Sequence, residues 1–229
     1  MRKAAFFDVD GTITTGRVWR GIMDYFKVRG QRRVTNALFW AYNTPSYLLF
    51  KARLISQSAF RRRWASSLPW YFRGYSLEKA DQIWTYVVRD YLKDLWRPDA
   101  LELIRQHKAD GDLVVLVSAG PTPLTSCIAK EVGAEFAIGT LPEQRDGHYT
   151  GRIAGPVCME EFKARLTVDE LRRRKIEVNL PESFAYADSS GDVDLLEMVG
   201  HPVAMYPDKH LRPIAIERGW RVIGEADED

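Results

Sequence analysis

Short apolar runs alternate with longer segments of helical spacing along most of the chain. The first run, AAFFDV at residues 4–9, ends in acid and glycine, which indicates a buried strand followed by a loop. Similar apolar runs predict further strands at 113–120, 183–188, 201–207 and 219–224. Apolar residues three and four apart predict helices at 99–108, 124–132, 158–175 and from Val193 onward.

This alternation predicts an α/β fold with a Rossmann-like parallel sheet and helices on both faces. Residues 135–153 depart from the alternation, because they are strand-like on both sides of Asp146–Gly147, a strong hairpin signal. Acidic residues follow the predicted strands at 4–9 and 183–188. Open parallel sheets bind ligands at the carboxyl ends of their strands, so we expect the functional site there.

A long helical segment separates the first predicted strand from the second. It runs from Val18 to about Trp96, with four expected breaks where Gly, Pro, Asn or Ser occur, at Gly30, Asn43–Pro45, Leu68–Pro69 and Gly74–Ser76. We therefore predict two domains. Residues 1–14 and 99–229 form a catalytic core, and residues 15–98 form an inserted α-helical cap domain that lies over the strand ends.

Composition and charge differ sharply between these two parts. The chain of 229 residues is 45% hydrophobic and 28% charged, as is usual for a globular protein. Its net charge is only +2, but residues 15–98 hold 16 Lys and Arg against five Asp and Glu. The same residues hold 18 of the 27 aromatic side chains. The two parts are therefore suited to different surroundings.

Cysteine content and hydropathy indicate the compartment. The two cysteines, Cys127 and Cys158, do not make a disulfide framework, so we expect free thiols in a reducing compartment. The N-terminal apolar run is short and two aspartates follow it, which argues against a secretory signal. No run of 18 apolar residues is present, so we expect no transmembrane helix. These features predict a cytoplasmic protein.

The sequence DVDGT at residues 8–12 offers the first candidate chemistry. Asp8 and Asp10 are two residues apart, so they would share a face of the strand end, where Gly11 lets the backbone turn. Two like charges in one place are costly unless a cation lies between them or one is protonated. Oxygen-rich sites suit Mg²⁺, and a carboxylate can be a nucleophile that forms an acyl phosphate. The alternative is that both aspartates cap a helix or shape a turn.

Four later residues could complete such a site. Ser118 ends the second strand and could donate a hydrogen bond to phosphate, and Lys163 could neutralise the phosphate. Asp188 and Asp192 follow the third strand and could complete a metal site. Three of the four also have a structural alternative: Ser118 as a local hydrogen bonder, Lys163 on a solvated helix face, and Asp188 as a helix N-cap.

The order DVDGT, VSAG, a lone lysine and ADSSGD resembles the four motifs of the haloacid dehalogenase superfamily. The form FAYADSSGDVDLL, and a helical insert just after the first motif, resemble its phosphoserine-phosphatase-like branch, subfamily IB. The resemblance covers nearly the whole chain. It implies a Mg²⁺-dependent phosphatase that hydrolyses a phosphate monoester through an aspartyl-phosphate.

The resemblance also implies roles in phosphoryl transfer. Asp8 resembles the nucleophile, and Asp10 resembles the acid that protonates the leaving oxygen and then activates water. Lys163 resembles the lysine that pairs with Asp8 and the phosphate. The implied phosphate cradle consists of Thr12, Ser118 and Gly120.

For the metal, the resemblance implies that Asp188 is a carboxylate ligand of Mg²⁺ and that Asp192 is its partner. Asp8 would lie against the same ion, which keeps it ionised. Asp10 would face the ion through its backbone carbonyl, because its carboxyl group must be able to hold a proton.

Two arginines bear on the substrate. Phosphoserine phosphatases carry an acid about nine positions after the nucleophile, which holds the substrate amine, and Arg17 stands there in this chain. That departure argues against phosphoserine. A cap arginine of the same enzymes matches Arg63 in ISQSAFRRRW, so we expect Arg63 to contact the substrate or its phosphate.

Basic residues interleaved with aromatic ones at 39–54 and 68–74 fit a surface near anionic lipid. The alternative is that these aromatic side chains form the core of the cap and the arginines are solvated. Such interleaving also occurs in nucleic-acid binders, but no recognised motif of that kind is present, so we expect no nucleic-acid partner.

The combined hypothesis is a capped phosphatase for a small or lipid-like phosphate monoester. A phosphorylated lipid headgroup or lysophospholipid is the first candidate substrate, with peripheral contact to a membrane through the cap. Phosphoserine or another soluble metabolite is the second, and a mutase is a third option. The non-enzyme alternative is a membrane-docking module that keeps a Mg²⁺-holding fold.

Overall fold

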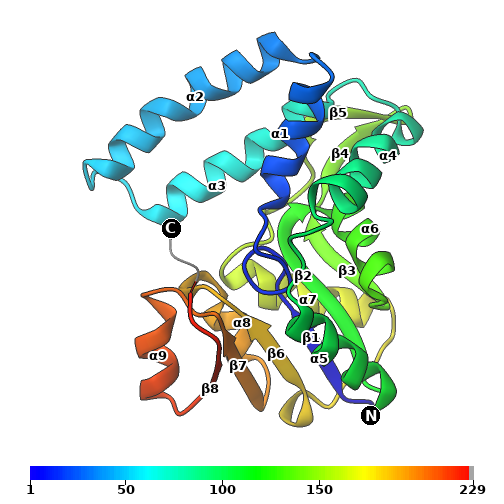
Figure 1. Cartoon of the computed structure of the whole chain (residues 1–229), viewed down its shortest axis with the longest axis vertical. Coiled ribbons are helices and arrows are strands. Elements are labelled where there is room, and N and C mark those ends of the chain that lie inside the picture. The colour runs from blue at the N-terminus through cyan, green and yellow to red at the C-terminus, as the bar shows by residue number, and fades with distance from the viewer. Residues whose placement is uncertain (227–229) are drawn as a thin grey trace.

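The structure is a computed structural model of the chain and describes residues 1–226. Its centre is a six-stranded parallel sheet in the order β3-β2-β1-β6-β7-β8 (Figure 1). The strands are β1 (Ala4–Phe7), β2 (Leu113–Pro121), β3 (Phe136–Thr140), β6 (Phe184–Ala187), β7 (His201–Met205) and β8 (Arg221–Ile223). The chain runs outward from β1 to β3 on one side and resumes beside β1 as β6, so the connection reverses direction between β1 and β6.

Helices cover both faces of the sheet, and the alternation of side chains along β1 shows why. Ala5 and Phe7 belong to the core shared with α5 (Pro98–Ala109) and α6 (Thr122–Val132), whereas Ala4 and Phe6 belong to a second core on the opposite face. The second core is shared with α7 (Glu161–Arg173), α8 (Val193–Glu197) and α9 (Leu211–Glu217). The predicted α/β fold is therefore confirmed.

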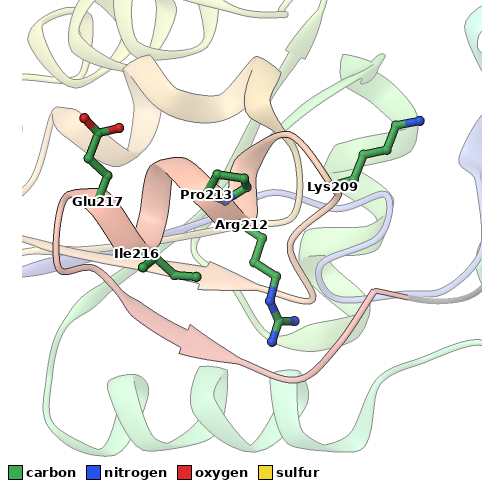
Figure 2. A pocket seen from close by; sticks show the side chains of 5 residues that line it. All are labelled: Lys209, Arg212, Pro213, Ile216 and Glu217. Carbon is green, nitrogen blue, oxygen red and sulfur yellow. The ribbon is translucent and has the colours of Figure 1, made fainter.

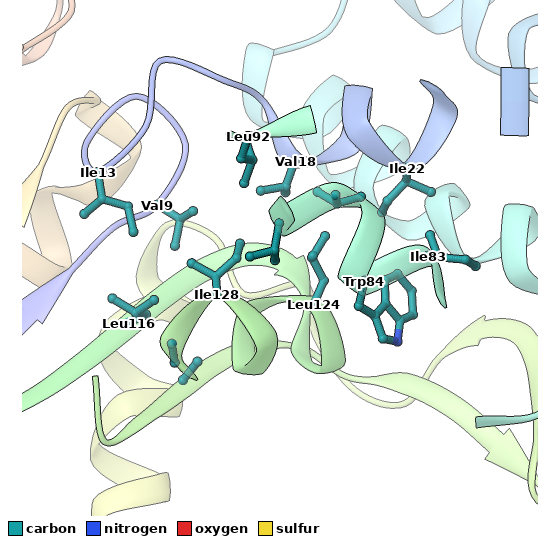
Figure 3. Close-up of a cluster of buried hydrophobic side chains, with 14 of the residues drawn as sticks. Val9, Ile13, Val18, Ile22, Ile83, Trp84, Leu92, Leu116, Leu124 and Ile128 are labelled. Carbon is teal, nitrogen blue, oxygen red and sulfur yellow. The ribbon is translucent and has the colours of Figure 1, made fainter. Parts of the chain in front are cut away.

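Residues 18–91 form the predicted helical segment. Its helices are α1 (Val18–Val28), α2 (Arg33–Lys51), α3 (Gln57–Ser67), η1 (Leu68–Phe72), α4 (Leu77–Tyr86) and the π-helical η2 (Val87–Tyr91). Figure 3 shows Ile22 and Trp84 from this segment in one apolar cluster with Leu116, Leu124 and Ile128. The segment thus shares its core with the sheet. The division into domains at residues 15 and 98 stays a prediction.

One expected break is wrong. Helix α2 runs without interruption through Asn43–Pro45. Proline has no N–H, so the carbonyl of Ala41 loses its helical partner. Ala41 and Pro45 are both exposed, and water can satisfy that carbonyl. A buried helix would not tolerate the same proline as easily.

The predicted hairpin at Asp146–Gly147 is present and joins the helical segment to the core. It consists of β4 (Pro142–Arg145) and β5 (His148–Ile153). The backbone N–H of Gly74 donates to the carbonyl of Tyr149 at 2.7 Å, and the N–H of Tyr149 donates to Tyr75 at 3.0 Å. The remaining short helices are η3 (Leu180–Glu182) and η4 (Ser190–Asp192).

No helix within residues 1–226 is both long and apolar enough to cross a bilayer. Cys127 and Cys158 are both free thiols.

Candidate active site

Three of the predicted residues lie at the carboxyl ends of neighbouring strands. Asp8 follows β1, Asp188 follows β6, and Ser118 lies in the last part of β2. This is the point where the chain reverses its direction across the sheet, and parallel sheets bind their ligands at such a point. The fold itself therefore brings these residues together.

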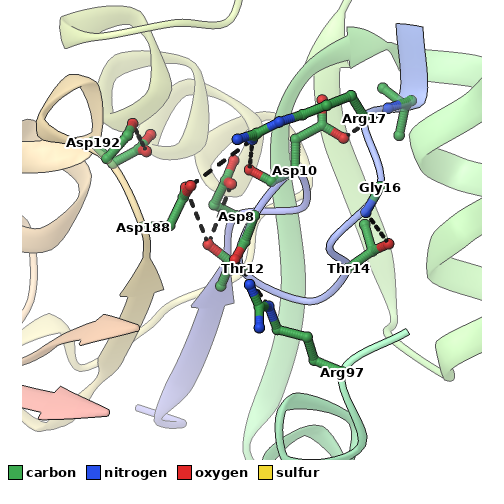
Figure 4. A network of polar contacts seen from close by, with 12 residues as sticks. Asp8, Asp10, Thr12, Thr14, Gly16, Arg17, Arg97, Asp188 and Asp192 are labelled. Carbon is green, nitrogen blue, oxygen red and sulfur yellow. Dashed lines mark hydrogen bonds and ion pairs between the residues drawn. The ribbon is translucent and has the colours of Figure 1, made fainter. Parts of the chain in front are cut away.

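The turn after β1 lies against Asp188, which follows β6. Gly11 adopts φ +99°, and a Cβ there would lie 2.0 Å from Oδ2 of Asp188, so both the backbone and the space require glycine. The hydroxyl of Thr12 donates to Oδ2 of Asp8 at 3.3 Å and lies 3.5 Å from Oδ1 of Asp188 (Figure 4). Thr12 therefore bridges the ends of β1 and β6.

Lys163 reaches this turn from α7. It is only 5% exposed, and its Nζ donates to Oδ1 of Asp8 at 2.5 Å and also pairs with Oδ1 of Asp192. Burial alone would lower the pKa of Lys163, but the adjacent charges of Asp192 and Asp8 outweigh it and raise that pKa. Lys163 is therefore a fixed buried cation, not a residue of a solvated helix face.

We call Asp8, Asp188 and Asp192 the carboxylate cluster, because ligand oxygens from all three lie within 4.8 Å of one another. Burial raises the pKa of Asp188, and the charges of Asp8 and Asp192 raise it further. The same burial raises the pKa of Asp8 despite its pairing with Lys163. Three carboxylates beside Lys163 and the partly exposed Arg17 leave an excess of one negative charge. An all-oxygen donor set with that excess fits a hard divalent cation.

Asp10 points its carboxyl group away from the carboxylate cluster. Its Oδ1 accepts from the backbone N–H of Val18 at 2.9 Å, at the start of α1. Its backbone carbonyl accepts from Nη1 of Arg17 at 2.8 Å, and this nitrogen lies 3.9 Å from Oδ2 of Asp188. Burial raises the pKa of Asp10 to about 7, so its carboxyl group can hold and release a proton near neutral pH.

Ser118 and Gly120 line the same cavity as Asp8. The backbone N–H of Gly120 donates to the hydroxyl of Ser118 at 3.0 Å. The cavity has a volume of about 1170 Å³ and extends from the carboxylate cluster to the helical segment. Its wall there is strongly aromatic and includes Trp19, Trp40, Tyr47, Phe60 and Trp64.

The family can now be assigned. Residues 5–197 match the family of haloacid dehalogenase-like hydrolases, and this range spans every residue of the carboxylate cluster together with Lys163. The chain belongs to this family. The resemblance that the motifs indicated is confirmed, and the chain is a hydrolase by family.

Two curated relatives and one solved structure show how far the similarity extends. The hydrolase is 33% identical to phosphoserine phosphatase SerB1 of Mycobacterium tuberculosis, over 96% of this chain and 70% of that protein. It is 27% identical to a histidinol-phosphatase of Neisseria meningitidis, over 97% of this chain and 99% of that protein. A Bordetella pertussis protein of unknown function has a similar structure, with a TM-score of 0.82, 30% identity and coverage of 98% and 99% of the two chains.

Arg63 is not among the residues that line the cavity of this hydrolase, so its predicted contact with the substrate stays a prediction. Its guanidinium lies 3.7 Å from the ring centre of Tyr42 and donates to the carbonyl of Tyr42 at 3.1 Å. Arg61 lines the cavity instead. Arg62 pairs with Glu160 at 2.5 Å and so connects α3 to the segment before α7. Successive residues of a helix point about 100° apart, so Arg61, Arg62 and Arg63 face different surroundings.

Two residues of the site had no sequence signal. Arg97 donates from Nε to the carbonyl of Gly11 at 3.2 Å, and its guanidinium lies 3.5 Å from the ring centre of Tyr206. It therefore supports the turn that carries Asp8. Glu160 accepts from the hydroxyl of Ser58 at 2.6 Å as well as from Arg62, so it holds α3 where the cavity is lined by both parts of the chain. Both contacts join residues that are distant in sequence.

A second hollow lies beside α9 and is lined by Lys209, Arg212, Pro213, Ile216 and Glu217 (Figure 2). Its one lining carboxylate belongs to Glu217, so this hollow lacks the paired acids that the first cavity contains.

Proposed function

We propose that this hydrolase is a phosphatase that releases phosphate from a phosphate monoester, with Asp8 as the nucleophile. The observation that carries the proposal is the 2.5 Å contact between Oδ1 of Asp8 and Nζ of Lys163 inside a cluster of buried carboxylates. The lysine and the hydroxyl of Thr12 orient the carboxylate of Asp8. Its Oδ2 is then available to attack phosphorus, and the positive charge of Lys163 offsets the repulsion between carboxylate and phosphate.

Asp10 supplies the proton transfers in this proposal. As Oδ2 of Asp8 bonds to phosphorus, the bond from phosphorus to the leaving oxygen breaks, and that oxygen takes a proton from Asp10. In the second half, Asp10 removes a proton from water, which attacks the aspartyl-phosphate and regenerates Asp8. A pKa of about 7 for Asp10 suits both steps near neutral pH.

Charge neutralisation completes the site. Mg²⁺, held by Asp8, Asp188 and the carbonyl of Asp10 with Asp192 beside it, would supply positive charge to the phosphate oxygens. The hydroxyl of Ser118 donates a hydrogen bond to a phosphate oxygen. The backbone around Gly120 and the hydroxyl of Thr12 complete the phosphate cradle. Phosphoryl transfer depends mainly on such positioning and neutralisation.

For the substrate, the relatives favour a soluble phosphorylated metabolite. One relative is named for phosphoserine and another for histidinol phosphate, and both match nearly all of this chain. The guanidinium of Arg17 beside Asp10 favours an anionic group on the leaving alcohol over an isolated amine. We therefore place a soluble metabolite first, with phosphoserine as one member of that class, in a cytoplasmic protein.

A lipid-like monoester is the second candidate. The cavity of about 1170 Å³ exceeds the usual size of a site for a drug-sized ligand, and its far wall is aromatic. A lysophospholipid or a phosphorylated lipid headgroup would contact that wall, whereas phosphoserine would leave it without contact. This candidate also requires access to a membrane.

The test is phosphate release from phosphoserine, histidinol phosphate and lysophosphatidate, with Mg²⁺ and with EDTA. We expect Mg²⁺-dependent release, fastest from one of the two soluble esters. Fastest release from lysophosphatidate would favour the lipid candidate. Transfer to a second hydroxyl without free phosphate would indicate a mutase. No release from any ester would contradict the proposal and favour a docking module.

A further inference from the structure

Helix α2 buries mostly polar side chains, whereas most helices bury apolar ones. Its buried residues are Phe39, Asn43 and Ser46, so two of the three are polar. The amide of Asn43 donates to the carbonyl of Phe39 at 2.9 Å and to the hydroxyl of Ser67 at 3.0 Å. The inward face of α2 is therefore narrow and partly polar, and it contacts α3.

The outward face of α2 is apolar over its whole length. Seven residues lie on this face at spacings of three and four, and all are exposed: Val34, Leu38, Ala41, Pro45, Leu48, Leu49 and Ala52 just beyond the helix end. We call them the outer α2 stripe. Val34 is 73% exposed, Leu38 58% and Leu48 60%. Figure 1 shows α2 at the outer edge of the molecule, away from the sheet.

The charged residues in the part of the sequence that contains the stripe have one sign. Ten Lys and Arg lie between Asp24 and Glu78, and no Asp or Glu lies among them. Arg33 is at the first turn of α2, and Lys51 and Arg53 are at its end, so cations flank the stripe at both ends. A second copy of this chain would oppose like charges across such a face, whereas an anionic surface would pair with them.

We infer that the outer α2 stripe docks on a bilayer that contains anionic lipid, with α2 lying in the plane of the headgroups. A helix with an apolar stripe and flanking cations binds membranes by burying the stripe among acyl chains while the cations contact lipid phosphates. A neighbouring side of α2, with Trp40 and Tyr47, lines the catalytic cavity. Docking would therefore place the cavity beside the lipid surface. The inference does not depend on the identity of the substrate.

The test is flotation of the metal-free full chain with phosphatidylcholine vesicles, with and without phosphatidylglycerol, at low and high salt. We expect binding only with phosphatidylglycerol and at least tenfold less binding in 0.5 M salt. Leu38→Glu and Leu48→Glu should each reduce the binding at least tenfold. Ile216→Glu is the matched control, because Ile216 is 67% exposed on α9, in the hollow of Figure 2 and not on α2, and this variant should bind as the wild type does.

Three outcomes would overturn the inference. The first is no binding to the phosphatidylglycerol vesicles by a wild type that is folded by circular dichroism. The second is an equal loss in Ile216→Glu, which would indicate non-specific adsorption. The third is a wild-type dimer in size-exclusion chromatography that Leu48→Glu converts to a monomer, which would assign the stripe to a second copy. Because none of these measurements uses turnover, their failure is separate from failure of the proposed phosphatase activity.

Discussion

The carboxylate cluster and the outer α2 stripe depart from the usual distribution of side chains in opposite directions. The cluster buries three charged groups, whereas the stripe exposes Val34, Leu38 and Leu48. Charges are rarely buried unless they are paired, and contiguous apolar patches are rarely exposed on monomers. Each departure indicates a component from outside the chain: a cation and a phosphate at the cluster, and a lipid surface at the stripe.

The two regions also differ in how strongly the protein depends on each residue. In the cluster, Lys163 contacts both Asp8 and Asp192, so removing Lys163 leaves two buried carboxylates without this partner. On the stripe, side chains extend into solvent, and most substitutions there should change the free energy of unfolding by less than about 0.5 kcal/mol. Mutation of the cluster should therefore lower activity, and it should also lower stability where a buried charge loses its partner, whereas mutation of the stripe should change neither quantity.

Asp8→Asn should have the largest effect. The amide is not a nucleophile, so we expect kcat for the best phosphate ester to fall by at least about 10³-fold. The melting temperature should stay near the wild-type value, because the amide oxygen can still accept from Lys163. Retention of a tenth of the wild-type activity would mean that another group is the nucleophile.

Lys163→Met should have the second-largest effect. It removes the cation that contacts Asp8 and Asp192, so we expect kcat to fall by about 10²-fold. We also expect the free energy of unfolding to fall by about 3 kcal/mol, because two buried carboxylates lose their partner. Lys130→Met, on the exposed face of α6, is the control and should change neither quantity. A variant with wild-type turnover would place Lys163 in a purely structural role.

Without metal, the free energy of unfolding should fall as pH rises. Burial raises the pKa of Asp10 from 3.8 to about 7 and also raises those of Asp8 and Asp188, so the folded state binds more protons than the unfolded state. The free energy of unfolding should therefore fall as pH rises from about 4 to 7. We expect a loss on the order of 2 kcal/mol, or about 5 °C in Tm, between pH 5 and pH 8 in EDTA.

Mg²⁺ should restore Tm more at pH 8 than at pH 5, because the ionised carboxylates are the form that binds a cation. Asp10→Asn should flatten the pH dependence in EDTA. A Tm in EDTA that rises between pH 5 and pH 8 would contradict the assignment of a buried, proton-binding Asp10.

Arg17→Gln should have a smaller effect, which is a change in the affinity for Mg²⁺. The guanidinium of Arg17 contacts the carbonyl of Asp10 at 2.8 Å and lies 3.9 Å from Asp188, so it occupies space near the oxygens that would bind Mg²⁺. Removing this cation should tighten Mg²⁺ binding about fivefold, measured by titration calorimetry. Arg20→Gln, one turn along α1, is the control. Weaker binding in Arg17→Gln would show that Arg17 supports the metal site.

The sequence predicted the core and its acids because both follow from position along a strand. Apolar runs defined the strands, and the carboxyl ends of parallel strands meet at one edge, so Asp8, Ser118 and Asp188 had to come together. Gly11 was equally predictable as the residue that turns the backbone. The helical nature of residues 18–91 followed from spacing alone.

The arrangement of the helical segment at residues 18–91 was less predictable, because it depends on contacts between distant residues. Asn43–Pro45 looked like a break, but α2 continues since its solvent-exposed side tolerates an unpaired carbonyl. The orientation of α3 is held by contacts such as that between Arg62 and Glu160, which lie 98 residues apart. That orientation determines which arginine of α3 lines the cavity, and the local sequence pattern does not predict it.

The smallest predicted effect therefore compares Arg61 with Arg63. Arg61 lines the cavity, so Arg61→Ala should raise KM about threefold and leave kcat nearly unchanged, as expected for a partly solvated charge that contacts the substrate. Arg63→Ala should leave KM within about twofold of the wild type, because Arg63 stacks on Tyr42 outside the cavity. Its effect should instead be a fall in Tm through loss of the cation–π contact. A larger rise in KM for Arg63→Ala than for Arg61→Ala would mean that α3 turns when substrate binds, because only a rotated helix could exchange the positions of the two guanidinium groups.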